Sequence, residues 1–463
     1  MKKIGGWQKW FFIGILYHFL WDFYIYFCGI FIDYPHNYCY NFTMYFNRLI
    51  ENQIAEKLKY SGAILIAGPK FCGKTTTSEM FAKSSVKLIT NQDIELAKIN
   101  DNFIFQGETP RLIDEWQVVP DIWNKVREKV DYKNSPGLYI LTGSSTPADK
   151  TQIHHSGAGR ISTLKMKSLT LTETLESKNI ISLKQAFDGV DKNIFYENKD
   201  YNIEETAFYI CRGGWPKSVT SDKSIALKIT KDYFDGLFEF ENSPNKKFRN
   251  KKKNIFKMIL KSYARNISTE ASFNTMIRDI EENENRKLDI KTFDEYIEAL
   301  QDIFIIEDIE AWNTNLRSKT AIRSTNTRHF YDTSIACQAL NISPNDLLND
   351  VKSFGFFFED FAIKELSVYA SLLNGKVMHY RDSNGLECDA IIHLDDGRWG
   401  MIEIKLGSND SIDYASTNLN NLDKRIDYSK FSRPSFKMIL TAFGPTYIRP
   451  DNIIVTSINC LTC

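Results

Sequence analysis

Short apolar runs alternate with helix-prone stretches from residue 44 to about residue 205. Residues 63–67, 111–113 and 137–141 are such runs, and each has the length of a buried strand. Strands that alternate with helices form parallel sheets covered by helices, so this part predicts an α/β domain. In such a domain the ligand binds at the carboxyl edge of the strands.

The pattern changes between residues 206 and 340, where apolar residues recur at spacings of three and four. This spacing is clearest in residues 255–264 and 292–303, and it predicts amphipathic helices. A strand-like stretch follows at residues 303–312, and residues 330–332 are expected to begin the next pair of helices. The middle of the chain is therefore predicted to be mainly helical.

Helix and strand patterns mix again in residues 341–463, which predict a second α/β domain. Residues 356–361 are expected to open an amphipathic helix, and residues 377–381, 387–392 and 401–405 are expected to be strands. Side chains alternate in the last of these strands. Glu403 and Lys405 therefore lie on one face of it.

The N-terminal residues leave three interpretations open. Residues 10–32 are almost continuously apolar and aromatic, and lysines at positions 2, 3 and 9 precede them. The length suffices to span a bilayer, but the lysines would then place the following domain outside the cytoplasm. His18 and Asp22 would also lie in the membrane at a cost. We expect residues 1–43 to be a dispensable or mis-assigned extension rather than a membrane-associated helix or buried core, so no membrane partner is expected.

The most specific motif directly follows the first apolar run. Two glycines let backbone N–H groups curl around phosphate oxygens, while Lys74 reaches the β- and γ-phosphates and Thr75 ligates magnesium. This pattern predicts a P-loop that binds ATP or GTP together with Mg²⁺, with an ordinary glycine turn as the alternative. The residues expected to bind the nucleotide are Gly68, Pro69, Lys70, Phe71, Cys72, Gly73, Lys74, Thr75 and Thr76.

The other two apolar runs end in polar residues. Asp114, 40 residues after Lys74, is expected to hold the magnesium ion, and Glu115 to polarise the water that attacks the γ-phosphate. Thr142 or Ser144, at the end of the third run, is expected to sense the γ-phosphate. For these hydroxyls the alternative is a plain strand followed by a serine turn.

Residues 155–160 form a glycine-rich segment that presents Arg160. An arginine can stabilise transition-state charge on the nucleotide of its own subunit or of a neighbour. A plain surface arginine is an equal alternative.

Basic residues cluster twice in the middle region. A basic run can contact nucleic-acid phosphates, although a solvated linker is the alternative. The second cluster follows the strand-like stretch, a position typical of the wing of a winged-helix unit. The two clusters are Lys246, Lys247, Arg249, Lys251, Lys252, Lys253 and Lys257, and Arg317, Lys319, Arg323 and Arg328.

Acids and a lysine gather in the last part of the chain. Asp389 lies 14 residues before Glu403, and these two acids, together with Glu359 on the packed helix, are expected to hold magnesium. Lys405 is expected to stabilise the charge on an attacked phosphodiester. This arrangement resembles the layout of a PD-(D/E)xK nuclease. Such residues also serve as simple polar edges, so a domain that binds nucleic acid or protein without cutting stays open.

The composition is that of an ordinary globular protein. With 463 residues the chain is expected to form two or three domains. Its 58 basic and 58 acidic side chains cancel, so any binding of nucleic acid depends on local patches. The eight cysteines are scattered, and the pair at positions 460 and 463 lacks the partners of a zinc site. Free thiols in the cytoplasm are therefore expected.

Taken together, the motifs resemble a widespread bacterial and archaeal family of AAA-type ATPases that carry a C-terminal domain of restriction-endonuclease-like fold. The matching residues are 68–76, 112–117, 140–145 and 155–161, with the acids and lysine described above. The resemblance begins at about residue 44 and runs to residue 463, and residues 1–43 have no counterpart in it.

The resemblance implies an AAA-type ATPase domain over residues 44–205, a helical and winged-helix region over 206–340, and a PD-(D/E)xK nuclease-like domain over 341–463. The expected protein is a cytoplasmic ATPase, with ATP and Mg²⁺ as cofactors, whose nucleotide state controls a nuclease-like domain acting on or near DNA. The alternative is a nucleotide-dependent switch or scaffold, in a defence or toxin–antitoxin setting, whose C-terminal domain binds a protein partner without cutting. A homo-oligomer stays open.

Overall fold

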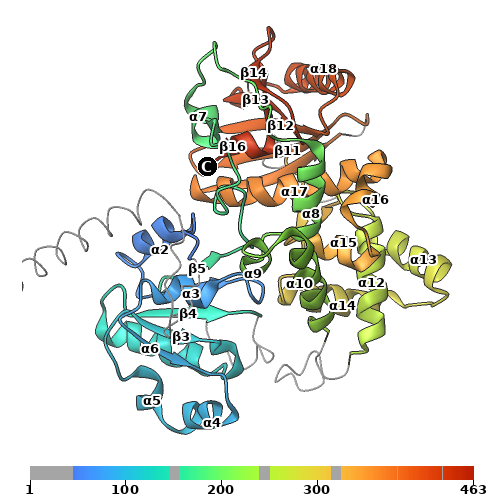
Figure 1. The fold of residues 1–463 in the computed structure, drawn as a ribbon. Helices are drawn as coiled ribbons and strands as arrows, with labels where there is room; N and C mark the ends of the chain where they lie inside the picture. The colour runs from blue at the N-terminus through green and yellow to red at the C-terminus, as the bar shows by residue number, and fades with distance from the viewer. Residues whose placement is uncertain (1–44, 146–155, 239–250, 314–324, 383, 430) are drawn as a thin grey trace, which may run out of the picture. The chain divides into compact units, whose positions relative to one another are not determined.

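The computed structural model describes residues 45–145, 156–238, 251–313, 325–382, 384–429 and 431–463, drawn as a coloured ribbon in Figure 1. Residues 1–43, with their three interpretations, lie outside this part of the chain. The described residues from Phe46 to Cys463 belong to one compact unit. In the described ranges, no helix combines the length and the apolar composition that a membrane span requires.

The first sheet follows the predicted apolar runs. Within the described residues it has five parallel strands in the order β2-β3-β4-β1-β5. This sheet confirms the predicted α/β organisation. Its strands are β1 (Ala63–Ala67), β2 (Ser84–Lys87), β3 (Arg111–Asp114), β4 (Tyr139–Gly143) and β5 (Ile161–Lys165). The helices around it are α2 (Glu51–Lys57), α3 (Lys74–Glu79), α4 (Asn91–Ile99), α5 (Asp101–Phe105) and α6 (Ile122–Lys133), with the short turn η1 (Trp116–Val118) after β3.

Alternate residues of these strands point to opposite faces of the sheet. On one face Ile64 and Leu112 share a buried cluster with Ile54 of α2. On the other face Ile113 shares a second cluster with Val126 of α6. Because helices cover both faces, the polar groups of the strands gather at the carboxyl edge, where β1 leads into α3.

The described part of the middle region is helical, as predicted, and contains one antiparallel pair of strands, β8 and β9. Phe330, expected to begin a helix, instead ends β9, because its N–H donates to Asp360 Oδ1 (2.9 Å) and its strand pairs with β8. The elements are α8 (Ile203–Arg212), α9 (Pro216–Val219), α10 (Lys223–Gly236), α12 (Lys253–Arg265), α13 (Phe273–Glu284), α14 (Ile290–Asp302), β8 (Ile306–Ile309), β9 (Thr327–Phe330), α15 (Ser334–Leu340) and α16 (Pro344–Asn349).

The second sheet is mixed and lies between two helices. Counted over the described residues it has seven strands in the order β10-β11-β12-β13-β15-β14-β7. Ile402 packs in the cluster that contains Phe361 of α17, and its neighbour Met401 packs with Leu419 of α18 on the other face. The elements are α17 (Val351–Leu372), β10 (Gly375–Arg381), β11 (Glu387–Leu394), β12 (Trp399–Lys405), α18 (Asn409–Arg425), β13 (Phe436–Thr441), β14 (Thr446–Ile448), β15 (Ile454–Ser457), η4 (Ile458–Cys460) and β16 (Leu461–Thr462).

A segment from the first half of the chain joins this second sheet. β7 (Phe195–Tyr196) pairs with β14, and β6 (Ile181–Ser182) pairs with β16. Between them, α7 (Leu183–Asp188) contributes Phe187, which packs against Phe436. The segment thus packs with the C-terminal strands, although the expected boundary at residue 205 groups it with the first domain.

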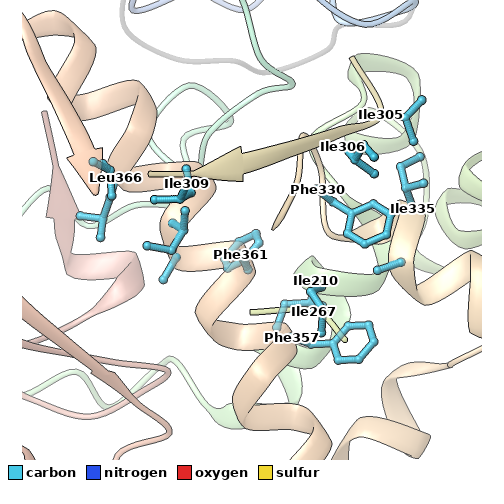
Figure 2. Close-up of a cluster of buried hydrophobic side chains, with 14 of the residues drawn as sticks. Ile210, Ile267, Ile305, Ile306, Ile309, Phe330, Ile335, Phe357, Phe361 and Leu366 are labelled. Carbon is cyan, nitrogen blue, oxygen red and sulfur yellow. The ribbon is translucent and has the colours of Figure 1, made fainter. Parts of the chain in front are cut away.

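α17 connects the second sheet to the middle region. Figure 2 shows Leu366 of this helix next to Ile309 of β8, and Phe357 next to Ile267 of the middle region. The helix begins at Val351, five residues before the expected start at 356, because the Asp350 side chain caps it by accepting from Ser353 N. It is buried on most sides, as expected of a helix packed between layers.

Candidate functional site

The loop between β1 and α3 holds the predicted phosphate-binding residues. Gly73 has a φ of +98°, in the left-handed region that favours glycine. At Gly68 an added Cβ would lie 2.1 Å from the Met166 carbonyl oxygen, so only glycine fits. Lys74 is buried, and its Nζ donates to the Pro69 carbonyl (2.7 Å). The lysine therefore points back over the loop that precedes it.

The remaining loop residues differ in exposure. Cys72 is buried, whereas Lys70 and Thr76 are exposed. Phe71 is 77% exposed and contacts the ring of Tyr233 on α10 edge to face.

Three polar side chains meet at the carboxyl edge of the sheet. Asp114 ends β3 and lies opposite Thr142 of β4 in the parallel ladder. Its Oδ1 accepts from Thr75 Oγ1 (2.9 Å) and from Thr142 Oγ1. A carboxylate and a hydroxyl are oxygen ligands of the kind that Mg²⁺ prefers. The pair Thr75 and Asp114 therefore fits a magnesium ion shared with a nucleotide phosphate.

Glu115 lies directly beyond this group, in a left-handed conformation with a φ of +58°. Its Oε2 accepts from Ser144 Oγ (3.0 Å) and from Gln117 Nε2. The structure thus brings Glu115 and Ser144 together. It also adds Gln117, which lies in the matching stretch 112–117 but to which sequence reasoning gave no role.

Arg160 lies at the opposite edge of the same sheet. It directly precedes β5, and its carbonyl accepts from Ala63 N at the start of β1. Its side chain is 46% exposed and pairs with Asp131 (2.8 Å). Within one chain the structure therefore does not bring Arg160 to Lys74.

The C-terminal acids meet around one lysine. Lys405 Nζ contacts Asp389 Oδ2 at 2.8 Å and Glu403 Oε2 at 2.7 Å. Asp389 also accepts from Ile404 N (2.7 Å), and Asn418 of α18 donates to Glu403 Oε1 (2.8 Å). Asn418 was missed by sequence reasoning because it lies outside the strand pattern that marked the other three.

Burial governs the acid–base properties of this group. Burial, with the nearby charge of Asp389, raises the pKa of Glu403 to about 8, against the opposing effect of Lys405. Burial alone would lower the pKa of Lys405, but Asp389 and Glu403 raise it above its ordinary value. The ammonium therefore keeps its charge beside the two acids.

Glu359 of α17 is close enough to this group for its charges to affect the Glu359 carboxyl. Burial, followed by the charge of Asp389, raises the pKa of Glu359 well above its ordinary value. Across the described ranges, no three or more His, Cys, Asp or Glu side chains are arranged to hold a metal ion. The structure joins Asp389 and Glu403 through Lys405, so the expected magnesium set with Glu359 stays a prediction.

A cavity of about 400 Å³ lies where β5, β8, α17 and β10 meet. Charged side chains line it, but Arg48 pairs with Glu173 and Lys167 pairs with Glu307. Because these charges neutralise one another inside the protein, we assign no ligand to this cavity.

The basic clusters are only partly described. Lys246, Lys247, Arg249, Arg317, Lys319 and Arg323 lie outside the described residues. Three described members have acidic partners: Lys251 pairs with Glu295 (3.4 Å), Lys257 with Asp235 (3.2 Å) and Arg328 with Asp308 (2.5 Å).

Three stretches of the chain match protein-family models. Residues 60–175 match the AAA domain. Residues 203–346 match a domain of unknown function, DUF8612, and residues 354–461 match another, DUF4143. The first match covers the P-loop together with Asp114 and Thr142. The first part of the chain is therefore an AAA-type P-loop domain, whereas the names of the other two matches carry neither a fold nor an activity.

Among curated proteins, the chain is similar to uncharacterized protein Rv2008c of Mycobacterium tuberculosis and uncharacterized protein Mb2031c of Mycobacterium bovis. Each is 21% identical over 368 residues, which are 78% of this chain and 74% of the relative. Solved structures with some likeness include the ORC2 protein of Aeropyrum pernix, 11% identical with a TM-score of 0.28, covering 65% of this chain and 91% of that one. A RuvB mutant of Thermogota maritima is 17% identical with a TM-score of 0.23, covering 64% and 94%. Scores this low support no conclusion about this chain.

Proposed function

We propose that the protein binds ATP with Mg²⁺ at its P-loop and hydrolyses it, and that the nucleotide state is coupled to a C-terminal domain acting on or near DNA. One observation supports the proposed binding and hydrolysis of ATP. Thr75, Asp114 and Thr142 meet through hydrogen bonds beside the glycine loop, within a stretch that matches the AAA domain.

The residues of the nucleotide site would have different roles in hydrolysis. Lys74 would exchange the Pro69 carbonyl for phosphate oxygens, while Thr75 and Asp114 would hold the metal. A bound Mg²⁺ ion supplies charge stabilisation for the transferred phosphoryl group. Glu115 would orient the attacking water, because its carboxylate lies next to Asp114 and is already fixed by Ser144.

The test of hydrolysis uses two variants. Lys74→Ala is expected to abolish ATP binding in calorimetry. Glu115→Gln is expected to retain binding and to lower kcat by about 100-fold or more. Wild-type protein that is well folded and gives no heat with Mg-ATP or Mg-GTP would contradict the proposal.

The contacts of α17 support coupling between the two parts. Lys364 Nζ donates to the Leu169 carbonyl (2.7 Å), and Glu365 Oε2 accepts from Leu171 N (3.0 Å). The same helix carries Glu359, whose pKa is affected by the charges of Asp389 and Lys405. We therefore expect α17 to be the connection between residues 169–171, which closely follow β5, and the C-terminal acids.

Action on DNA is proposed from the PD-(D/E)xK-like order of Glu359, Asp389, Glu403 and Lys405. The helices α12, α13 and α14, followed by the β8–β9 pair, support a winged-helix interpretation of the middle region. Plasmid cleavage that needs Mg²⁺, responds to ATP and disappears in Asp389→Ala would support this half. Intact plasmid and linear DNA under all nucleotide conditions would contradict it.

The alternative is a nucleotide-dependent switch or scaffold whose C-terminal domain binds a partner without cutting. The ion pairs of Lys405 with Asp389 and Glu403 favour it, because they already occupy the two carboxyl groups that a magnesium ion would need. A Lys405→Met chain that still binds its partner as wild type does would support this function.

Two further proposals concern the cellular compartment and the role of Arg160. The described cysteines are free thiols, which suits the cytoplasm, where ATP is available. Arg160 lies at the sheet edge opposite Lys74, so a role in hydrolysis would require the nucleotide of another subunit in a homo-oligomer. Mixing Arg160→Ala chains with Lys74→Ala chains would test this role by recovery of ATPase activity.

A further inference from the structure

Arg48 is a buried arginine next to the P-loop, outside residues 60–175 that match the AAA domain. It lies three residues before α2, and its guanidinium makes three hydrogen bonds. Nε donates to Glu173 (2.8 Å), Nη2 to the Lys167 carbonyl (2.8 Å) and Nη1 to the Cys72 carbonyl (2.6 Å). The third of these acceptors belongs to the P-loop itself.

The Cys72 carbonyl belongs to the same peptide group as the N–H of Gly73. In a trans peptide these two groups point in opposite directions. A hydrogen bond that holds the carbonyl toward Arg48 therefore holds the Gly73 N–H away from Arg48, toward the inside of the loop. Phosphates bind to the inward-facing N–H groups of a P-loop.

Gly73 needs such a constraint. Its φ of +98° belongs to a residue with wide conformational freedom, so the peptide before it can rotate unless something fixes it. The same glycine leaves space for the arginine, because an added Cβ would lie 3.4 Å from Arg48 Nη1. The glycine at position 73 and the hydrogen bond from Arg48 together indicate that Arg48 fixes this peptide.

Glu173 anchors the arginine in this position. It accepts from Arg48, from Leu49 N (2.9 Å) and from Thr170 N (2.8 Å). Because the carboxylate neutralises the guanidinium, Arg48 acts on the loop by fixing a carbonyl rather than by adding charge near the phosphates.

We infer that Arg48 is a positioning residue of the nucleotide site, which holds the Cys72–Gly73 peptide so that its N–H group meets the nucleotide phosphates. The inference rests on the proposed ATPase function. It adds a residue that no motif of the P-loop contains.

Arg212 offers a matched control. Its side chain is 6% exposed, against 5% for Arg48, and it also pairs with a glutamate, Glu176, at 2.5 and 2.7 Å. Its Nε donates to the backbone carbonyl of Gly213 (3.1 Å), which is not part of the P-loop. Loss of either arginine removes a buried ion pair, but only Arg48 bonds to the phosphate loop.

The experiment compares Arg48→Met with Arg212→Met in the full chain. Arg48→Met is expected to raise the Kd for ADP and the KM for Mg-ATP by about 10- to 100-fold, the loss expected for a hydrogen bond to a charged group. Its kcat is expected to stay within about twofold, because the loop binds ground and transition states alike. Arg212→Met is expected to lower the melting temperature similarly and to leave Kd and KM within about twofold.

A second pair of variants, Arg48→Lys and Arg212→Lys, keeps a cation beside each glutamate. This pair tests the role of Arg48 if the methionine variants do not fold. KM values that change equally at both positions, or at neither, would overturn the inference while the wild type still binds nucleotide. A folded wild type that gives no heat with ADP or Mg-ATP would instead overturn the proposed function itself.

Discussion

At the scale of single residues, Glu115 is fixed more firmly than a solvent-exposed acid. Ser144 Oγ donates to it at 3.0 Å, Gln117 donates to the same oxygen, and the left-handed backbone turns the side chain off the strand direction. A carboxylate that must orient a water gains from such fixing, because the geometry is set before the substrate binds.

Replacing Ser144 by alanine is therefore expected to lower kcat for ATP hydrolysis by about tenfold, the cost of one hydrogen bond to a charged group. The KM is expected to stay within about twofold, since Ser144 contacts Glu115 rather than the P-loop. Steady-state ATPase assays measure both constants. Ser145→Ala, one residue further along, is the control, and an equal loss in that variant would contradict the role of Ser144.

Glu173→Gln is expected to lower the free energy of unfolding at pH 7 by about 3 kcal/mol, because it leaves Arg48 without its buried partner. Burial alone would raise the pKa of Glu173, but the charge of Arg48 and the hydrogen bonds to the carboxylate lower it below its ordinary value of 4.5. Its stabilising effect is therefore present above that value and lost as the pH falls through the folded-state pKa.

Urea denaturation of wild type and Glu173→Gln, repeated between pH about 7 and about 3.5, measures this effect. The difference between the two proteins should shrink at the acid end. A constant difference over the whole range would show that the ionised form of Glu173 is not the one that stabilises the fold.

Some of these residue contacts follow from the sequence, and others do not. Asp114 ends β3 and Thr142 is the last residue but one of the neighbouring parallel strand β4, so their proximity follows once the strands are recognised. Arg48 is 24 residues from Cys72 and 125 from Glu173, and no periodic pattern links a side chain to acceptors that far away. Its contacts depend on the packing of residues 165–173 behind the loop.

At the scale of elements, α17 is the helix whose surroundings matter most. Its buried face includes charged side chains, of which Lys364 is 2% exposed and Glu365 is 1% exposed. Lys364 bonds to both Glu365 (2.7 Å) and the Leu169 carbonyl (2.7 Å). The sequence predicted a helix here from its apolar residues, but it could not show which charges would be buried, because that depends on the loop after β5.

Lys364→Met is expected to lower the free energy of unfolding by about 2–4 kcal/mol, since it leaves Glu365 and the Leu169 carbonyl with fewer buried partners. Lys352→Met is the control on the same helix. Because Lys352 is exposed, its replacement should change stability by less than about 0.5 kcal/mol. Urea denaturation compares them, and equal effects would contradict a structural role for the buried lysine.

At the scale of the whole molecule, the described core is continuous across the expected domain boundaries. One buried cluster includes Ile54 beside the P-loop sheet, Phe330 in the middle region and Leu461 next to the C-terminal end. The pairing of β6 with β16 joins residues about 280 positions apart. The pattern of a single sequence indicates a strand but not the distant strand with which it pairs. The sequence therefore predicted the domains but not the buried core that they share.

The shared core predicts cooperative unfolding of the described unit. Peptides from β3 and from β12 are expected to exchange their amide hydrogens with the same free energy of opening, because Leu112 of β3 and Ile402 of β12 pack in the same buried cluster. At a concentration of about 100 times its Kd, Mg-ATP should raise both free energies of opening by about 2.7 kcal/mol. Hydrogen-exchange mass spectrometry measures the two peptides in one sample, and Lys74→Ala should show no nucleotide effect in either. If nucleotide protects β3 and leaves β12 unchanged, the P-loop domain opens independently, and coupling through a common core is wrong.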